Sequence, residues 1–385
     1  MTTSLVLSKN DLASVRLDQD KLLKRRMPRP PELRQKGYED EFDFHTVFFD
    51  TFRLPSGGTR FLGPRPLNLK KIINQSTLTL DGRTKKLTDW EGLSYGRVNR
   101  TYRMDIEQNF DRFEISLPVG QTLSGTVQEN RSELFRGRRV LMTMIKYDPL
   151  EWVAQWAEFH VNAQGIDALL IYNNEALNYT SEDIEHALKA VPGLEVIVVI
   201  DWSFPYGPGA GGSGLWDSAF AQTGAMEHAR YRFLSEAACV VNADVDELVF
   251  SHHATETVAS LVAKSRSGYL RYYCRDASGP NGLDRRKPQA ERRFSDSYYV
   301  DVTGRERLGK WVVVPSLCPA KFEWGTHQIG QMESDLGKAR FLCYRHFGEF
   351  NTGWKSERSN PEGVFQKDET MYQTYRRVGW FDSAT

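Results

Sequence analysis

The residues best suited to chemistry are three carboxylates within four positions, Asp244, Asp246 and Glu247, in the segment NADVDE. They follow an apolar run at 239–241 that is typical of a buried strand. In an extended backbone, side chains at positions i and i+2 point to the same side, so the two aspartates can act together. Carboxylate oxygens are hard ligands that suit Mg²⁺ or Mn²⁺. Because three adjacent acids repel one another, a bound cation gives a physical reason for the cluster. The alternative is an acidic surface turn that binds nothing.

The elements that would position this cluster alternate between strands and helices. Helices are predicted at 149–165, 181–191 and 215–237, and apolar strands at 138–146, 166–174, 194–202 and 238–250. This alternation predicts a mostly parallel sheet with both faces covered, in which ligands bind beyond the carboxyl ends of the strands.

Three regions are predicted along the chain. Residues 1–37 are read as a charged, proline-punctuated tail, in which the run at 24–26 is either solvated or in contact with an anionic partner. Residues 38–136 carry short β-branched and aromatic segments separated by turn signals such as Asp81-Gly82, which predicts a small β-rich module of sandwich type. Residues 137–385 would form the catalytic domain. The module could bind carbohydrate, form a dimer contact or act as a structural flank.

The composition limits the class of protein. Fifty basic and fifty acidic residues give no net charge, which argues against a nucleic-acid-binding protein. The sequence shows no apolar run of membrane-spanning length and no secretory signal. Four widely spaced cysteines are typical of reduced thiols. We therefore expect a cytoplasmic protein, with a peripheral contact at the inner face of the membrane as an option. The oligomeric state cannot be predicted.

The order of the motifs resembles the metal-dependent glycosyltransferases of GT-A fold in the family 2 clan, especially the family 92 type and its bacterial relatives. The likeness rests on IKYDPLEWVAQWAEFHVNAQGIDALLIYNN followed by NADVDELVF, and covers roughly residues 138–350. The sequence departs from the family pattern at Tyr147-Asp148, where Asn-Glu is usual, and at Leu248-Val249, where Glu-Phe-Leu is usual. The resemblance implies an α/β fold of Rossmann-like GT-A type, a mostly parallel sheet flanked by helices.

The resemblance also implies roles for individual residues. Asp244 and Asp246 would bind the metal and, through it, the donor diphosphate. A further set at the ends of the first two strands would face the donor nucleotide: Lys146, Asp148, Asn173 and Asn174. Glu247 and Asp276 are the candidates for the general base that an inverting enzyme needs to deprotonate its acceptor.

A second set of residues comes late in the chain. His327 or His346 would be a further metal ligand, a role in which imidazole suits Mn²⁺ better than Mg²⁺; the alternative is a histidine that only packs. Lys355 and Arg358 would clamp diphosphate oxygens, or form a solvated basic face. The loop GPGAGGSG at 207–214 is expected to be a mobile lid.

These expectations combine into a metal-dependent glycosyltransferase for polysaccharide biosynthesis. It would use a nucleotide sugar, with UDP-sugar as the expected donor, and a glycan or lipid-linked acceptor, with inversion of configuration. The alternatives are a nucleotidyltransferase, which also uses carboxylate-bound Mg²⁺, and a non-catalytic glycan-binding or scaffold protein.

Overall fold

The structure is a computed structural model of the whole chain. It describes residues 2–86, 91–92, 101–146, 148–176, 178–211, 214, 216–251, 256–280, 291–304, 306–334, 341–345 and 363–381.

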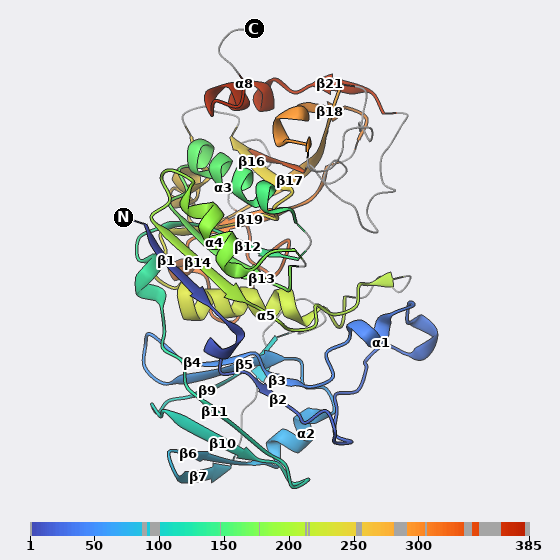
Figure 1. Cartoon of the computed structure of the whole chain (residues 1–385), viewed down its shortest axis with the longest axis vertical. Helices are drawn as coiled ribbons and strands as arrows, with labels where there is room; N and C mark the ends of the chain where they lie inside the picture. The colour runs from blue at the N-terminus through green and yellow to red at the C-terminus, as the bar shows by residue number, and fades with distance from the viewer. Residues whose placement is uncertain are drawn as a thin grey trace.

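A mixed sheet of eleven strands is the largest element of the described chain (Figure 1). Its first five strands are mutually parallel and rich in buried apolar side chains, as expected for strands with covered faces. In spatial order they are β1 (Thr3–Leu7), β14 (Val196–Asp201), β13 (Ala168–Asn173), β12 (Arg139–Ile145) and β15 (Cys239–Asn242). The strands predicted at 138–146, 166–174 and 194–202 are therefore confirmed.

The remaining strands of this sheet pair mostly in the antiparallel sense. From β15 outward they are β19 (Arg307–Val313), β17 (Tyr269–Ser278), β18 (Tyr299–Asp301) and β21 (Phe365–Lys367). Two more strands lie beside this path, β16 (Glu247–Ser251) and β20 (Phe341–Arg345). They pair antiparallel with each other, and β20 runs parallel to β17.

The predicted GT-A, Rossmann-like fold with a mostly parallel, helix-flanked sheet is wrong. Within the described residues, the large sheet has five parallel and five antiparallel strand pairings, and helices are few. A parallel return needs a crossover of about a dozen residues or more, usually a helix. Between β15 and β20, the described chain contains one short α-helix, α6 (Val258–Ala263). The alternation seen at 139–242 therefore does not continue, and the strands after it return in the antiparallel sense.

Three helices contact the parallel strands. α3 (Leu150–Gln164) and α4 (Ser181–Lys189) contribute to one hydrophobic cluster, and α5 (Phe220–His228) contributes to a second cluster. Alternate residues of β12 belong to the two clusters, Leu141 to the first and Met142 to the second, as the two-residue period of a strand requires.

The sequence predicted both ends of α3 correctly but made the helix at 215–237 too long. α3 follows Pro149 and ends at Gly165, whose φ of +66° is left-handed, as predicted from the two residue types. The helix predicted at 215–237 is shorter: α5 is followed by a π-helical turn, η5 (Ala229–Phe233). Another helix, α8 (Glu369–Arg377), packs against the first cluster.

Residues 38–136 form short antiparallel sheets, which Figure 1 shows in blue and teal. Their side chains build a third hydrophobic cluster, which also includes Val15 and Leu17. One sheet has the order β4 (Asp50–Arg53), β5 (Thr59–Pro64), β9 (Thr101–Ile106) and β8 (Glu91–Gly92), and another the order β11 (Thr122–Thr126), β10 (Arg112–Ser116), β6 (Thr77–Leu80) and β7 (Arg83–Lys86). A two-stranded sheet joins β2 (Val15–Arg16) to β3 (Thr46–Phe48), and two short helices, α1 (Tyr38–Glu41) and α2 (Leu69–Asn74), complete the region. The predicted Asp81-Gly82 turn joins β6 to β7, with positive φ at both residues. The division of the chain into domains stays a prediction.

The N-terminal segment is not the solvated tail that was predicted. β1 pairs in parallel with β14 and is the edge strand of the large sheet. Arg25, inside the run read as solvated, is buried, and its guanidinium donates to the carbonyl oxygens of Arg65, Asp43 and Thr46. A strand of five residues is too short to show a periodic pattern, and an arginine that binds carbonyl oxygens shows none either. The prediction of a tail therefore rested on the charged composition alone, and it was wrong.

None of the described helices has the length and hydropathy needed to span a bilayer.

Candidate functional site

The acidic cluster lies on a tight turn between β15 and β16. The Asp244 N–H donates to Glu247 Oε2 (3.0 Å), and the Glu247 N–H donates to the Asp244 carbonyl oxygen (2.9 Å). The ligand atoms of Asp244, Asp246 and Glu247 all lie within 4.8 Å of one another. The cluster is thus brought together by a turn and not by the extended geometry that was predicted, since β16 begins only at Glu247.

A buried lysine that the sequence analysis missed faces this turn. Lys310 on β19 is fully buried, and its Nζ lies 2.8 Å from Asp244 Oδ1 and 3.9 Å from Glu247 Oε2. Burial lowers the pKa of Lys310, but the charges of Asp244 and Glu247 outweigh it and hold the pKa above its usual value. The ammonium therefore stays charged and balances part of the acidic cluster. The sequence did contain an indication of this contact, a single lysine within the apolar run LGKWVVV. Lysine is almost never buried without a partner, so a lysine in such a run points to a nearby acid.

Glu247 lies beneath the turn, with only 2% of its surface exposed. Burial raises its pKa to about 8; Lys310 opposes the shift, while Asp244 and Asp246 add to it. Lys310 offsets only part of this rise, because it lies closer to Asp244 than to Glu247. A largely protonated carboxyl under the turn is a poor acceptor-side base.

Two side chains one turn apart on α3 hold β16, the strand that begins with Glu247. His160 Nε2 accepts a hydrogen bond from the Val249 N–H (3.3 Å), and Gln164 Nε2 donates to the Val249 carbonyl oxygen (2.8 Å). Gln164 Oε1 also accepts from the Val258 N–H (2.9 Å). Both backbone groups of Val249 are thus satisfied from α3, which fixes the strand two residues from the acidic turn.

His327, a predicted metal ligand, lies close enough to interact electrostatically with Lys310 and Asp244. Burial, reinforced by Lys310, lowers its pKa to about 4, against the opposing effects of the Gly309 carbonyl and Asp244. The imidazole is therefore neutral near pH 7. Nδ1 lies 2.9 Å from the Gly309 carbonyl oxygen and must donate to it, so Nε2 carries the lone pair. This is the tautomer that a metal ligand needs, although His327 is not part of the three-carboxylate group.

The strand-end residues predicted to face a nucleotide form a polar network. Lys146 Nζ donates to Asn174 Oδ1 (3.2 Å), and the Lys146 N–H donates to an oxygen of Asp148 (3.4 Å). Asn174 Nδ2 donates to the carbonyl oxygens of Trp202 (2.7 Å) and Phe204 (2.9 Å). Asn174 thus braces the chain after β14, a structural role that the sequence did not indicate.

Asn173 is also engaged within the fold. Its Nδ2 donates to Ser181 Oγ (3.1 Å), and its Oδ1 accepts from the Ala176 N–H (2.9 Å). Of the four strand-end residues, Lys146 supplies the cationic group. Burial lowers the pKa of Lys146, while Glu175 and Glu41 raise it.

A tyrosine links Lys146 to the acidic turn. The Lys146 ammonium lies 5.4 Å from the centre of the Tyr206 ring, and the Tyr206 hydroxyl donates to Gln222 Oε1 (3.4 Å). Burial raises the Tyr206 pKa to about 12, and Asp244 adds to the rise. The two aromatic residues that precede Tyr206 in this segment, Trp202 and Phe204, are buried in the core.

A small hollow lies beside the turn, lined by Thr143, Gln222, Asn242 and Asp244 among other residues. The Thr143 hydroxyl is buried and has no hydrogen-bond partner within the described part of the chain. An unsatisfied buried hydroxyl costs free energy, so its persistence at the hollow favours a polar ligand or a water there.

The glycine-rich loop is attached to the N-terminal segment. Arg29 Nη1 donates to the carbonyl oxygens of Gly209 (3.0 Å) and Ala210 (3.2 Å), and its Nη2 lies 2.7 Å from Asp217 Oδ1. Both Arg29 and Asp217 are buried. These contacts fix the described part of the loop; its predicted role as a lid stays a prediction.

The other predicted site residues separate into two groups. Asp276 lies on β17 and is exposed. His346, Lys355 and Arg358 lie outside the described residues, so their predicted roles stay predictions.

No model of a known protein family matches the chain, and no curated protein sequence matches it. The resemblance of its motifs to glycosyltransferases therefore remains a prediction.

Proposed function

We propose that this protein is a metal-dependent glycosyltransferase that moves a sugar from a nucleotide sugar, with a UDP-sugar as donor, to a hydroxyl group of a glycan or lipid-linked acceptor. The observation that carries the proposal is the acidic turn, where the ligand atoms of Asp244, Asp246 and Glu247 lie within 4.8 Å at the carboxyl end of β15. The cytoplasmic location and the role in polysaccharide assembly expected from the sequence belong to the same proposal.

The donor set of the turn fits a hard divalent cation. Mg²⁺ and Mn²⁺ prefer carboxylate oxygens and fill their remaining positions with water and phosphate. Asp244 and Asp246 would hold the ion, and the neutral imidazole of His327 favours Mn²⁺ over Mg²⁺. When bound, such a cation stabilises the negative charge of a departing nucleoside diphosphate.

The neighbouring side chains suit a bound nucleotide. The Lys146 ammonium and the Tyr206 ring lie together, at 5.4 Å, and offer a cation and an aromatic surface for a phosphate and a base or sugar. The Thr143 hydroxyl in the hollow offers a further hydrogen bond. Gln222 Oε1 accepts hydrogen bonds from both Tyr206 and Thr326. These two contacts fix the Gln222 side chain between the Tyr206 ring and the acidic turn.

Of the two predicted bases, Asp276 fits the acceptor side better. A base that takes a proton from an acceptor must reach it directly or through one water. Asp276 is exposed, whereas Glu247 is buried and accepts the Asp244 N–H. We therefore assign Glu247 to the shape of the turn and Asp276 to proton transfer.

Calorimetric titration of UDP and GDP, with Mn²⁺ and then with EDTA, tests the proposal. The proposal expects UDP binding that EDTA abolishes. Asp246→Asn removes a ligand charge at nearly constant volume, so it should lose metal-dependent UDP binding while its unfolding transition stays unchanged. Asp20→Asn, which alters an exposed aspartate in the N-terminal segment, is the matched control.

The other outcomes separate the alternatives. Unchanged UDP affinity in Asp246→Asn would remove the metal-site assignment. Absence of binding by either nucleotide would favour a scaffold or glycan-binding protein. Release of pyrophosphate from a sugar phosphate and a nucleoside triphosphate would identify a nucleotidyltransferase.

A further inference from the structure

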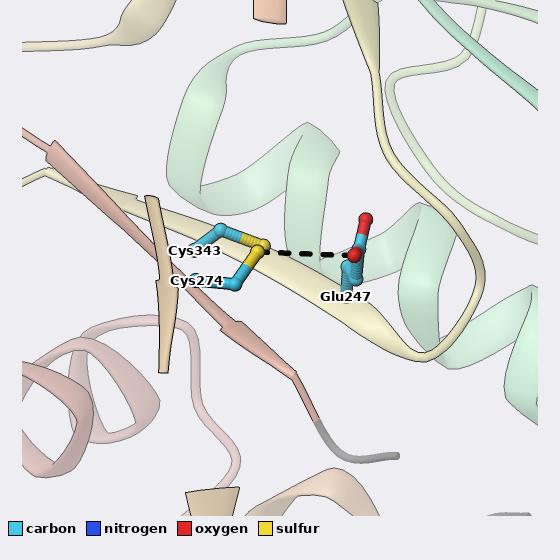
Figure 2. A group of neighbouring side chains, drawn as sticks. All are labelled: Glu247, Cys274 and Cys343. Atoms are coloured by element: carbon cyan, nitrogen blue, oxygen red, sulfur yellow. Dashed lines mark hydrogen bonds between the residues drawn. The ribbon is translucent and has the colours of Figure 1, made fainter. Parts of the chain in front are cut away.

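Two cysteines and a glutamate meet in the core behind the acidic turn. Cys274 on β17 and Cys343 on β20 are direct partners in a parallel pairing, so their side chains lie on the same side of the sheet. Figure 2 shows the two sulfur atoms side by side, with Glu247 of β16 reaching towards them. Cys274 Sγ lies 3.8 Å from Glu247 Oε1, and the ligand atoms of all three residues lie within 4.8 Å of one another.

This environment differs from that of the other two cysteines. A buried cysteine ordinarily packs as a small apolar residue. Cys239 and Cys318 are buried as well, and neither belongs to a metal-ligand group found among the described residues. Cys274 and Cys343 instead face the carboxyl group of Glu247, of which only 2% is exposed. A thiol is a weak hydrogen-bond donor, so two thiols compensate poorly for burying that oxygen.

We propose that Cys274, Cys343 and Glu247 form a binding site for a thiophilic divalent cation, with Zn²⁺ as the expected ion. Two sulfur ligands and one carboxylate oxygen are a set that zinc accepts, and a water would complete four-coordination. This site is separate in chemistry from the hard-cation turn, because Mg²⁺ and Mn²⁺ select oxygen ligands and sulfur selects zinc. The inference does not depend on the proposed glycosyl transfer.

The observed distances suit this ion. Zn–S bonds of about 2.3 Å and Zn–O bonds of about 2.0 Å at a tetrahedral angle place sulfur and oxygen about 3.5 Å apart. The 3.8 Å between Cys274 Sγ and Glu247 Oε1 is close to that edge.

The bound ion would leave little net charge in the core. Two thiolates, the Glu247 carboxylate and Zn²⁺ sum to one negative charge, next to a Lys310 ammonium that is shared with Asp244. Lys310 lies 3.9 Å from Glu247 and interacts with Cys274. On binding, two S–H bonds break, two Zn–S bonds form, and two protons pass to solvent, with a third from Glu247 where that carboxyl is protonated.

Glu247 connects this buried site to the surface. One carboxylate oxygen accepts the Asp244 N–H in the turn, and the other faces the thiols. Glu247 therefore lies between the acidic turn and the cysteines. Since the two oxygens of Glu247 serve different sites, occupancy of one site does not exclude occupancy of the other.

Cobalt titration of the reduced, chelator-treated full chain tests the proposal. One equivalent of Co²⁺ should produce a thiolate-to-cobalt charge-transfer band and tetrahedral ligand-field bands, and Zn²⁺ should displace both. Cys274→Ser and Cys343→Ser should lose the charge-transfer intensity, whereas Cys239→Ser and Cys318→Ser should retain it. Glu247→Gln removes the anionic oxygen ligand and should keep the thiolate bands, with affinity weaker by at least the roughly 10- to 100-fold that loss of an outer partner of a metal site causes.

A measurement on the unaltered chain guards against variants that fail to fold. Zn²⁺ should protect Cys274 and Cys343 from alkylation in mild denaturant, and leave the rates at Cys239 and Cys318 unchanged, as read by mass spectrometry. Asp246→Asn should keep the cobalt bands while losing metal-dependent UDP binding, which separates this site from the proposed function. The inference is overturned if no charge-transfer band forms, if both pairs of cysteine variants respond alike, or if the two thiols are found as a disulfide.

Discussion

Protonation of His160 should destabilise the fold at mildly acidic pH. The ring is fully buried; its Nδ1–H donates to the Trp156 carbonyl oxygen (2.8 Å), and its Nε2 accepts from the Val249 N–H (3.3 Å). A proton on Nε2 would face that N–H directly and remove the acceptor. Burial lowers the His160 pKa to about 4, and the Trp156 contact opposes the shift only in part.

The magnitude follows from the two pKa values. The unfolded chain binds a proton on this histidine below pH of about 6.5, and the folded chain only below about 4. Stability is therefore fully present above pH 6.5 and falls as the pH decreases toward 4, since the unfolded state binds more protons in that window. At 1.36 kcal/mol for each pKa unit, the free energy of unfolding falls by at most about 3.4 kcal/mol. About 2.5 kcal/mol of this decrease is reached by pH 4.5.

Urea unfolding at several pH values between 8 and 4.5 isolates this effect by comparing the protein with His160→Gln. Glutamine offers an oxygen to the Val249 N–H but does not titrate. The variant should be less stable at pH 8, and the difference between the two proteins should shrink by about 2.5 kcal/mol at pH 4.5. His186→Gln, at an exposed histidine of α4, should follow the unaltered protein at every pH. A constant difference between the protein and His160→Gln would refute the reasoning.

Two further predictions concern the hollow and the lysine beside it. Lys310→Met should lower the free energy of unfolding by about 3 kcal/mol, as measured by urea unfolding. This is the lower end of the range for breaking a buried ion pair, because the Asp244 side chain is 39% exposed. Lys321→Met, at an exposed lysine, is the control. Thr143→Val removes a buried hydroxyl with no described partner, so stability should stay equal or rise by about 1 kcal/mol, while metal-dependent UDP affinity should weaken about 2- to 10-fold. Unchanged affinity would mean that no ligand uses this hydroxyl.

Local patterns in the sequence predicted the parts of the fold that depend on neighbouring residues. Continuous apolar runs predicted β12, β13 and β14, and Pro149 and Gly165 predicted both ends of α3, because strand burial and helix termination depend on nearby residue types. The acidic cluster was also recognisable, since its members are adjacent in the chain.

The parts that failed depend on distant residues. The pairing of β1 with β14 joins positions almost two hundred residues apart, and nothing in a five-residue edge strand specifies its partner. The antiparallel half of the sheet follows from connections whose described residues include no long α-helix, a feature hidden by strands of mixed polarity. Lys310 meets Asp244 across 66 positions, so the charge balance of the site could not be read from the acidic segment alone.

Glu247 shows why loss of activity in one variant cannot assign a role at this site. The same carboxyl accepts the Asp244 N–H, lies 3.9 Å from the Lys310 ammonium and faces Cys274. Removing it would disturb the turn, the buried lysine and the thiols together. A comparison of variants separates them: Lys310→Met removes the charge beside Asp244 and Glu247 but replaces no proposed ligand. Cys343→Ser replaces a ligand without touching the turn, and Asp276→Asn leaves all three contacts in place. If transfer is lost in Asp276→Asn while UDP binding and the cobalt bands remain, proton transfer belongs to Asp276 and the role of Glu247 is to hold the turn.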